Sequence, residues 1–214
     1  MIDVNKQILI VIGIVSAIVL LIVVFTSPGE NKPAETEPKL QSSDMNGHHE
    51  PEVADEKKFQ SLMGSQAPDF TLESYDRGQV SLKQLRGKKV VIFFTEGLMC
   101  YPSCWNQMAA FVKDKTFNNS DTITLSIAVD RKEEWKQAVE KMPELSRAIV
   151  LFDSDRKVSN DYGVLSLSSS MHKGQFPGHT YLILDREGVV RFTYDDPQMG
   201  IRNDELKIEL DKLE

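Results

Sequence analysis

A run of five apolar residues, 90–94 (VVIFF), narrows the choice of fold more than any other stretch of the chain. Its β-branched and aromatic side chains favour a strand. No polar residue occupies every second position, so both faces of this strand are expected to be buried. A strand of this kind lies inside a sheet that has helices packed on both sides, and the chain must therefore supply further strands and helices for each face.

The rest of the chain contains patterns that predict these further strands and helices. Residues 123–129 alternate between apolar and polar, residues 148–152 form a short apolar run, and residues 180–184 and 189–194 flank a turn at 185–188. These patterns predict two more strands and a hairpin. Helices are predicted over residues 102–115, 132–142 and 156–162, and a last helix is expected to begin after an N-cap at Asn203 and to end near Leu213. The order of these strands and helices along the chain predicts an α/β fold with a central mixed β-sheet flanked by helices.

Charge and cysteine content exclude several classes of function. The net charge is −7, and the basic residues form no cluster longer than the pairs at 57–58 and 88–89. A nucleic-acid partner is not expected, because phosphate backbones require a basic footprint. The two cysteines, Cys100 and Cys104, are too few for a multi-bridge secreted scaffold. A redox pair or half of a metal site are the two interpretations that this spacing leaves open.

Residues 8–25 form an uninterrupted apolar run without a charge. A helix of this length rises about 27 Å, which is close to the thickness of the hydrocarbon core of a bilayer. A cleaved signal peptide is the alternative, but only Lys6 supplies positive charge before the run, and no small-residue cleavage pattern follows it. We therefore expect residues 1–26 to form one N-terminal transmembrane helix that anchors the chain.

The flanking segments set the expected topology. Lys6 and the N-terminal amine favour a cytoplasmic N-terminus, which predicts a single-pass protein of the cell membrane with its soluble domain outside the cytoplasm. Residues 27–58 hold four prolines, no aromatic residue, and eight acidic residues against four lysines. Such a segment cannot bury enough apolar surface to fold, so it is predicted to be a disordered acidic linker. The folded domain is expected over residues 59–214.

Several segments of this domain resemble the peroxiredoxin (AhpC/TSA) family. The resemblance begins with residues 64–72 (GSQAPDFTL), 80–88 (VSLKQLRGK) and the apolar strand, and it continues through 153–155 (DSD), 162–164 (YGV) and 180–191 (TYLILDREGVVR). It covers about residues 61–194 in the order of the family. The resemblance implies a thioredoxin-like fold and thiol-based redox chemistry without a cofactor. It also implies a peroxide or a protein disulfide as substrate, and a thioredoxin-like or other dithiol protein as reductant.

The two cysteines stand where this chemistry needs them. Cys100 lies just before a predicted helix, Pro102 suits the first helical position, and Cys104 falls in the first turn. Backbone N–H groups and the helix dipole stabilise a thiolate there. Four helical residues rise about 6 Å, which is within the Cα separation that a disulfide tolerates. We expect Cys100 to attack the substrate, because it precedes the helix and is the more accessible, and Cys104 to resolve the intermediate.

The sequence also departs from the family pattern. Peroxiredoxins carry a Pro seven residues before the reactive cysteine and a Thr or Ser three residues before it, where this chain has Phe93 and Gly97. The hydroxyl that helps hold the peroxide is absent unless Thr95 substitutes for it. The family's downstream Arg is replaced within residues 177–179. Three more supporting residues are expected near the pair: Trp105, Pro177 as a candidate for the cis-proline of thioredoxin-like folds, and His179.

A second family offers an alternative function. Cys-x-x-x-Cys with a distant His before a Tyr-Leu strand resembles the membrane-anchored SCO-type copper chaperones. That resemblance implies Cys100, Cys104 and His179 as copper ligands, a set of soft thiolates and an imidazole that suits this metal. His179 stands only two residues before Tyr181, closer than is usual in that family. A neutral histidine that hydrogen-bonds a cysteine is therefore the favoured interpretation, with no metal bound.

Overall fold

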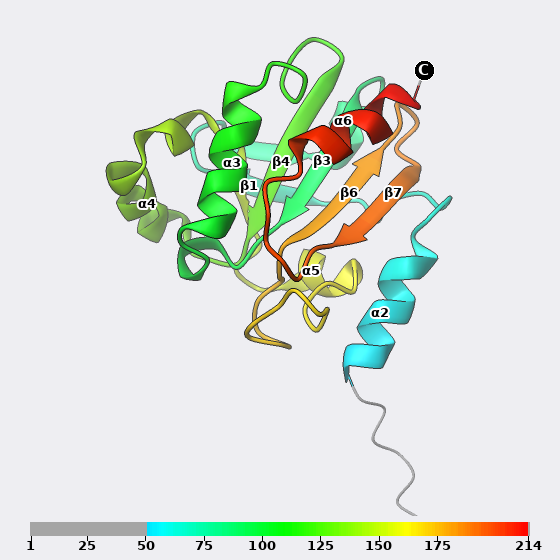
Figure 1. The fold of residues 1–214 in the computed structure, drawn as a ribbon, viewed down its shortest axis with the longest axis horizontal. Coiled ribbons are helices and arrows are strands. Elements are labelled where there is room, and N and C mark those ends of the chain that lie inside the picture. The colour runs from blue at the N-terminus through cyan, green and yellow to red at the C-terminus, as the bar shows by residue number, and fades with distance from the viewer. Residues whose placement is uncertain (1–50, 214) are drawn as a thin grey trace, which may run out of the picture. The chain divides into compact units, whose positions relative to one another are not determined.

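One mixed sheet forms the centre of the part that the computed structural model describes, residues 51–213 (Figure 1). The order of its strands is β2-β1-β5-β4-β3-β6-β7. Strand β3 pairs in parallel with β4 and antiparallel with β6, which confirms the predicted mixed sheet and hairpin. The bounds are β1 Thr71–Ser74, β2 Gln79–Ser81, β3 Lys89–Phe94, β4 Thr122–Ala128, β5 Val150–Phe152, β6 Thr180–Leu184 and β7 Val190–Asp195.

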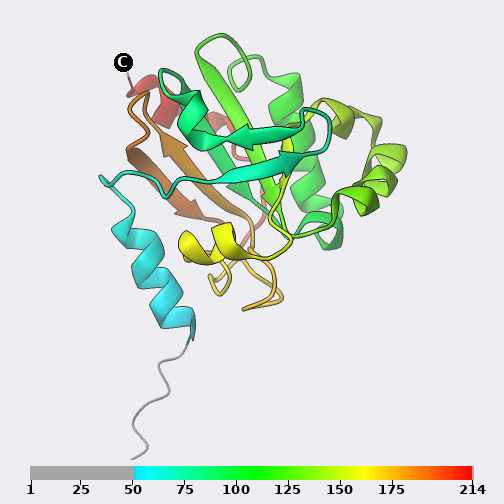
Figure 2. The same ribbon diagram turned by 180° about the vertical axis from the view of Figure 1, so that it is seen from behind.

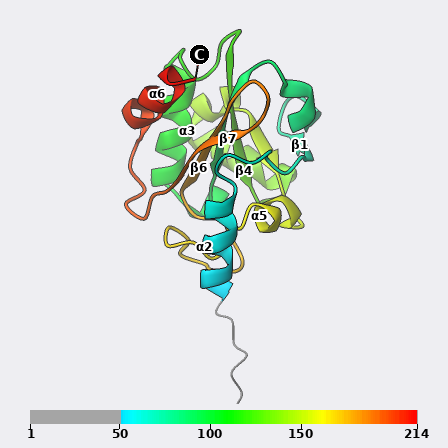
Figure 3. The ribbon, with the colours of Figure 1, turned by 90° about the vertical axis from the view of Figure 1, so that its right-hand side faces the viewer.

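Helices cover both faces of this sheet, as Figures 2 and 3 show. Helices α3, α4 and α6 pack on one face, and α2 and α5 on the other. The α-helices are α2 Pro51–Ser61, α3 Ser103–Lys113, α4 Lys136–Lys141, α5 Lys157–Asp161 and α6 Asn203–Asp211. Short 3₁₀ helices are η1 Leu82–Leu85, η2 Gly97–Met99, η3 Lys132–Trp135 and η4 Pro143–Arg147.

Strand β3 is buried from both sides, as its apolar run predicts. Val90, Ile92 and Phe94 belong to the core beneath α2 and α5, whereas Val91 and Phe93 belong to the core beneath α3, α4 and α6. All five side chains are at most 2% exposed. The strand therefore has no solvated face, and the chain can turn toward solvent only where β3 ends.

The structure corrects the predicted boundary between linker and domain. The folded domain was predicted to begin at Phe59, but helix α2 already begins at Pro51. Phe59 and Leu62 at its end are buried in the core beneath α2 and α5. Gly163 lets the chain after α5 approach this helix, because a Cβ there would lie 2.8 Å from the carbonyl oxygen of Asp55. The polar residues before Phe59 give no apolar period, so the sequence pattern did not reveal the helix.

The rest of the predicted N-terminal region, the transmembrane helix over residues 1–26 and the linker up to residue 50, lies outside the described residues. Within residues 51–213, no helix is both long enough and apolar enough to cross a bilayer.

Other differences are local. Strands β1 and β2 are short and largely exposed, so they show no apolar run and were not predicted. The predicted helix over 132–142 is η3 followed by α4. Asn203 is the first residue of α6 and not its N-cap, which is Arg202. The Asn203 side chain instead bridges to α3, where its Nδ2 donates to the carbonyl oxygen of Ala110 and its Oδ1 accepts from Gln107.

Asp130 connects the end of β4 to the segment that follows β3. Its carboxylate oxygen Oδ2 accepts a hydrogen bond of 3.1 Å from the backbone N–H of Leu98. The residue is only 9% exposed. Burial raises the pKa of its carboxyl group to about 6, and the nearby Glu134 carboxylate adds to this shift. The folded state therefore favours the protonated carboxyl group, which is the neutral form.

Replacing Asp130 by Asn tests this assignment. A carboxyl group whose pKa rises on folding stabilises the fold at low pH, and that contribution is lost as the pH rises through about 6. Between pH 4.5 and 7.5 the wild-type protein should therefore lose about 2 kcal/mol of stability relative to the Asp130→Asn variant. Urea unfolding of both proteins at the two pH values measures this difference. Parallel pH profiles would contradict it.

Candidate active site

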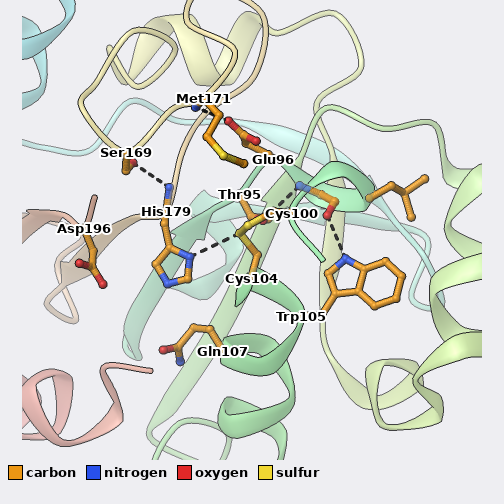
Figure 4. The surroundings of a disulfide bond; sticks show 12 residues. Thr95, Glu96, Cys100, Cys104, Trp105, Gln107, Ser169, Met171, His179 and Asp196 are labelled. Carbon is orange, nitrogen blue, oxygen red and sulfur yellow. Dashed lines mark hydrogen bonds between the residues drawn. A yellow bond between two sulfur atoms is a disulfide. The ribbon is translucent and has the colours of Figure 1, made fainter. Parts of the chain in front are cut away.

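The two cysteines meet where β3 gives way to α3 (Figure 4). Cys100 follows η2, Cys104 lies in the first turn of α3, and their sulfurs form a disulfide bond with a Cα separation of 5.4 Å. The expected positions and the expected pairing are both confirmed. The expected difference in accessibility is small in this oxidised state, since Cys100 is 3% exposed and Cys104 is fully buried.

Hydrogen bonds fix the segment between β3 and Cys100. The Thr95 hydroxyl accepts from the N–H of Gly97 at 3.1 Å, and the Trp105 indole N–H donates to the carbonyl oxygen of Gly97 at 2.9 Å. Gly97 has a φ of +61°, and a Cβ there would lie 1.7 Å from an Asp130 carboxylate oxygen, so no larger residue fits. Thr95 and Trp105 thus hold the cysteine loop, and the Trp105 ring packs edge-on against Tyr101 next to Cys100.

His179 lies against the disulfide, although 75 residues separate it from Cys104. Its Nδ1 is 3.4 Å from the Cys104 sulfur. Its Nε2 is 2.6 Å from the Tyr181 hydroxyl and 3.1 Å from the carbonyl oxygen of Gly200. A carbonyl oxygen only accepts, so the network assigns the ring proton to Nε2 and leaves the Nδ1 lone pair facing Cys104.

Burial keeps this imidazole neutral. Desolvation lowers the pKa of His179 to about 4, although the Gly200 carbonyl and the Asp196 carboxylate favour the charged form. The structure thus places His179 next to Cys104, in surroundings that favour the neutral imidazole.

A second layer of polar residues holds His179 and was not found by sequence reasoning. Burial raises the pKa of Tyr181, so its hydroxyl stays protonated, and it donates to the Gln107 side-chain oxygen at 3.1 Å. The same oxygen accepts from the N–H of Arg202 at 2.7 Å. The Ser169 hydroxyl oxygen accepts a hydrogen bond of 2.8 Å from the backbone N–H of His179. These residues come from α3, β6 and two loops, and no local pattern in the sequence connects them.

Glu96 links two loops at the site. Its side chain is fully buried, and Oε1 accepts from the N–H groups of Met171 at 2.6 Å and His172 at 3.3 Å. The other oxygen lies 3.3 Å from His172 Nδ1. Glu96 therefore joins the cysteine loop to the loop of residues 163–179. The sequence alone does not predict this role, because a glutamate in a loop is ordinarily exposed to solvent.

The expectation for Pro177 is wrong. The cis peptide bond in the described residues precedes Pro102, and the bond before Pro177 is trans. Pro177 is buried two residues before His179. The backbone of this segment is held by Ser169, whose Oγ accepts from the N–H of His179, and Gly178 packs so tightly against Ser169 that a Cβ would lie 2.0 Å from Oγ. His179 thus occupies the position next to β6 that faces the disulfide.

The three sulfur and nitrogen atoms form a potential metal-binding set. The ligand atoms of Cys100, Cys104 and His179 all lie within 4.8 Å of one another. The short spacing between His179 and Tyr181 does not keep the imidazole away from the cysteines. While the sulfurs are joined in a disulfide they are not thiolates, so only the reduced protein offers this set to a metal ion.

Comparisons with known proteins agree with this geometry. The model of the AhpC/TSA family matches residues 63–193. Over 136 residues, which are 62% of this chain, it is 34% identical to a chloroplast peroxiredoxin Q of Suaeda salsa and 29% identical to peroxiredoxin Bcp of Escherichia coli. The match spans 59% of the length of the Suaeda protein and 85% of the length of the Escherichia protein.

Solved structures extend the comparison to the fold. The reduced 2-Cys peroxiredoxin of Plasmodium vivax superposes with a TM-score of 0.59 at 25% identity, over 71% of this chain and 95% of that one. A putative protein disulfide isomerase of Bacteroides thetaiotaomicron superposes with a TM-score of 0.53 at 21% identity, over 71% of this chain and 89% of that one. The fold is thioredoxin-like, and the chain belongs to the AhpC/TSA family.

Proposed function

We propose that this protein is a thiol-dependent oxidoreductase that uses Cys100 and Cys104 to reduce protein disulfides and peroxides. The observation that carries the proposal is the disulfide at the start of α3, with His179 Nδ1 3.4 Å from the Cys104 sulfur. Relatives named peroxiredoxin support thiol redox chemistry in general.

The proposed cycle begins with the reduced pair. With a peroxide, the Cys100 thiolate attacks one oxygen and becomes a sulfenic acid while an alcohol or water leaves. Cys104 then attacks the Cys100 sulfur, and the disulfide forms with release of water. With a protein disulfide, the Cys100 thiolate forms a mixed disulfide that Cys104 resolves. In either case an external dithiol protein, such as a thioredoxin-like reductant, restores both thiols and becomes oxidised itself.

Three contacts support these roles. The start of α3 favours a thiolate at Cys100, because unpaired N–H groups and the helix dipole stabilise negative charge there. The Nδ1 lone pair of His179 offers an acceptor to a Cys104 thiol. Cys100 is 3% exposed and Cys104 is fully buried, so Cys100 is the residue of the pair that a substrate reaches first.

Disulfide exchange is proposed as the main reaction and peroxide reduction as the slower one. Gly97 offers no hydroxyl at the position where peroxiredoxins hold the peroxide. The Phe93 ring is buried and stacked on Tyr181 at 4.9 Å, so it offers the substrate no polar group. The Thr95 hydroxyl is buried and accepts a hydrogen bond from the N–H of Gly97, so it is engaged within the loop and does not replace the missing hydroxyl.

Single substitutions separate the roles of the two cysteines. Cys100→Ser should abolish reaction with peroxide and with protein disulfides, because the attacking sulfur is lost. Cys104→Ser should allow the first step and trap it, as a sulfenic acid with peroxide or as a mixed disulfide with a protein. Mass spectrometry after treatment with a sulfenic-acid reagent or a disulfide-bonded protein detects both products. Adducts that form on Cys100→Ser but not on Cys104→Ser would show that the roles are reversed.

A copper-binding function is the second candidate, favoured by the 4.8 Å cluster of Cys100, Cys104 and His179. Reduced protein should then bind one Cu(I) ion per chain in anaerobic titration against a competing chelator, and His179→Ala should lower the affinity at least about tenfold. His172→Ala is the matched control, because His172 contacts Glu96 and belongs to no part of this set. Equal affinities in all three proteins would exclude His179 as a copper ligand, and absence of Cu(I) binding to the reduced wild-type protein would exclude this function.

We further propose that residues 8–25 anchor the protein in the cell membrane, with its redox domain outside the cytoplasm. The uncharged apolar run supports the anchor, and Lys6 before it supports the orientation. Protease added to intact cells should therefore remove the domain and leave a short membrane-bound fragment. Full-length chain that becomes sensitive only after the cells are opened would contradict the orientation, and release of the chain by a high-salt wash would contradict the anchor.

A further inference from the structure

Exposed apolar side chains gather around the disulfide. Among residues 55–213, whose side chains the structure describes, six large apolar side chains are strongly exposed, and four of them adjoin residues of the active site. These four, here called the apolar collar, are 49–60% exposed and comprise Met99, Tyr101, Met171 and Ile201. The other two are Met63, after α2, and Ile208, on α6.

The sheet brings the loops of the four collar residues to one end of its strands. Phe94, the last residue of β3, pairs with Thr180, the first residue of β6, and Thr180 pairs with Asp195, the last residue of β7. Three loops carry the collar, and all of them adjoin the sheet at this same end of its strands: residues 95–102, 163–179 and 196–202. Figure 1 shows these loops together at the lower end of the domain.

Each collar residue is tied to the site through a neighbour. Met99 and Tyr101 flank Cys100 in the chain. Met171 donates its N–H to Glu96 of the cysteine loop, and Figure 4 shows the two residues next to each other. Ile201 follows Gly200, whose carbonyl oxygen lies 3.1 Å from His179 Nε2.

Part of the collar is held in place before any partner arrives. The Lys141 ammonium nitrogen lies 3.5 Å from the centre of the Tyr101 ring, and the Trp105 ring packs edge-on against Tyr101 at 4.9 Å between centroids. The buried Glu96 carboxylate fixes the backbone of Met171. Side chains that are already ordered lose little conformational entropy on binding.

The burial of the sulfurs makes contact with the collar unavoidable for a large reductant. Only 3% of Cys100 is exposed, so a protein thiol that reaches its sulfur must press against the residues around it. Aromatic residues and methionine are enriched in protein interfaces, and the flexible methionine side chain adapts to the surface that covers it. A small dithiol reaches the same sulfur and covers almost none of the collar.

We propose that the apolar collar is the docking surface for a protein dithiol reductant of thioredoxin-like fold. This inference rests on the proposed redox function. A thiolate of the partner attacks the Cys100 sulfur, and Cys104 leaves and takes a proton. The partner's second thiolate then attacks the partner's own sulfur in the mixed disulfide and releases Cys100. The partner loses two electrons and two protons and becomes a disulfide, and the Cys100–Cys104 pair gains both.

The test compares a protein reductant with a small one. The oxidised full-length protein is treated with a reduced bacterial thioredoxin or with dithiothreitol, and the second-order rate of disulfide opening is measured for each. The double variant Met99→Ser/Met171→Ser should react about tenfold more slowly with thioredoxin, whereas its rate with dithiothreitol should stay within about twofold. The matched control is Met63→Ser/Ile208→Ser, which removes equally exposed apolar side chains away from the site and should leave both rates unchanged.

Each other outcome has a defined meaning. Equal loss with both reductants would show that the two methionines act on the disulfide itself, and unchanged rates with both would show that they contribute nothing; either result overturns docking on the collar. If the wild-type disulfide opens with dithiothreitol but not with thioredoxin, the collar proposal fails and the redox function stands. If it opens with neither reductant, the proposed function itself fails.

Discussion

Burial of both faces of β3 is the constraint on which the rest of this structure depends. Val90, Ile92 and Phe94 belong to one core and Val91 and Phe93 to the other, so the strand contacts apolar side chains along its whole length. Polar chemistry is excluded from such a strand because an unpaired polar group is costly in an apolar core. The reactive residues therefore lie beyond Phe94, where the chain first leaves the sheet.

The neighbours of β3 bring distant residues to that same point. Parallel β4 ends there and places Asp130 beneath the cysteine loop, and antiparallel β6 begins there and places His179 against Cys104. The hydrogen bonds from Tyr181 to Gln107, and from the Arg202 N–H to the same Gln107 oxygen, then connect the sheet to α3 and α6. A single pairing arrangement thus sets the cysteine loop, the imidazole and its supports.

Much of this arrangement could be predicted where the signal is local. The run at 90–94 predicts the central strand, the turn at 185–188 predicts the β6–β7 hairpin, and the position of Cys100 and Cys104 predicts their disulfide. Contacts between distant segments could not be predicted in the same way. The distance from His179 to Cys104 depends on the register of β3 against β6, and the burial of Glu96 depends on a loop that folds back onto it. Helix α2 carries too few apolar residues to give a period, and its contacts with the domain become visible only in three dimensions.

The close approach of Gly97 to Asp130 also restricts how this sequence can change over time. A Cβ at position 97 would lie 1.7 Å from a carboxylate oxygen of Asp130, so a side chain at 97 fits only if position 130 becomes smaller. A smaller residue at 130 would in turn leave the N–H of Leu98 without its acceptor. The two positions are distant in the chain, yet whether a side chain can be accepted at position 97 depends on the residue already present at position 130.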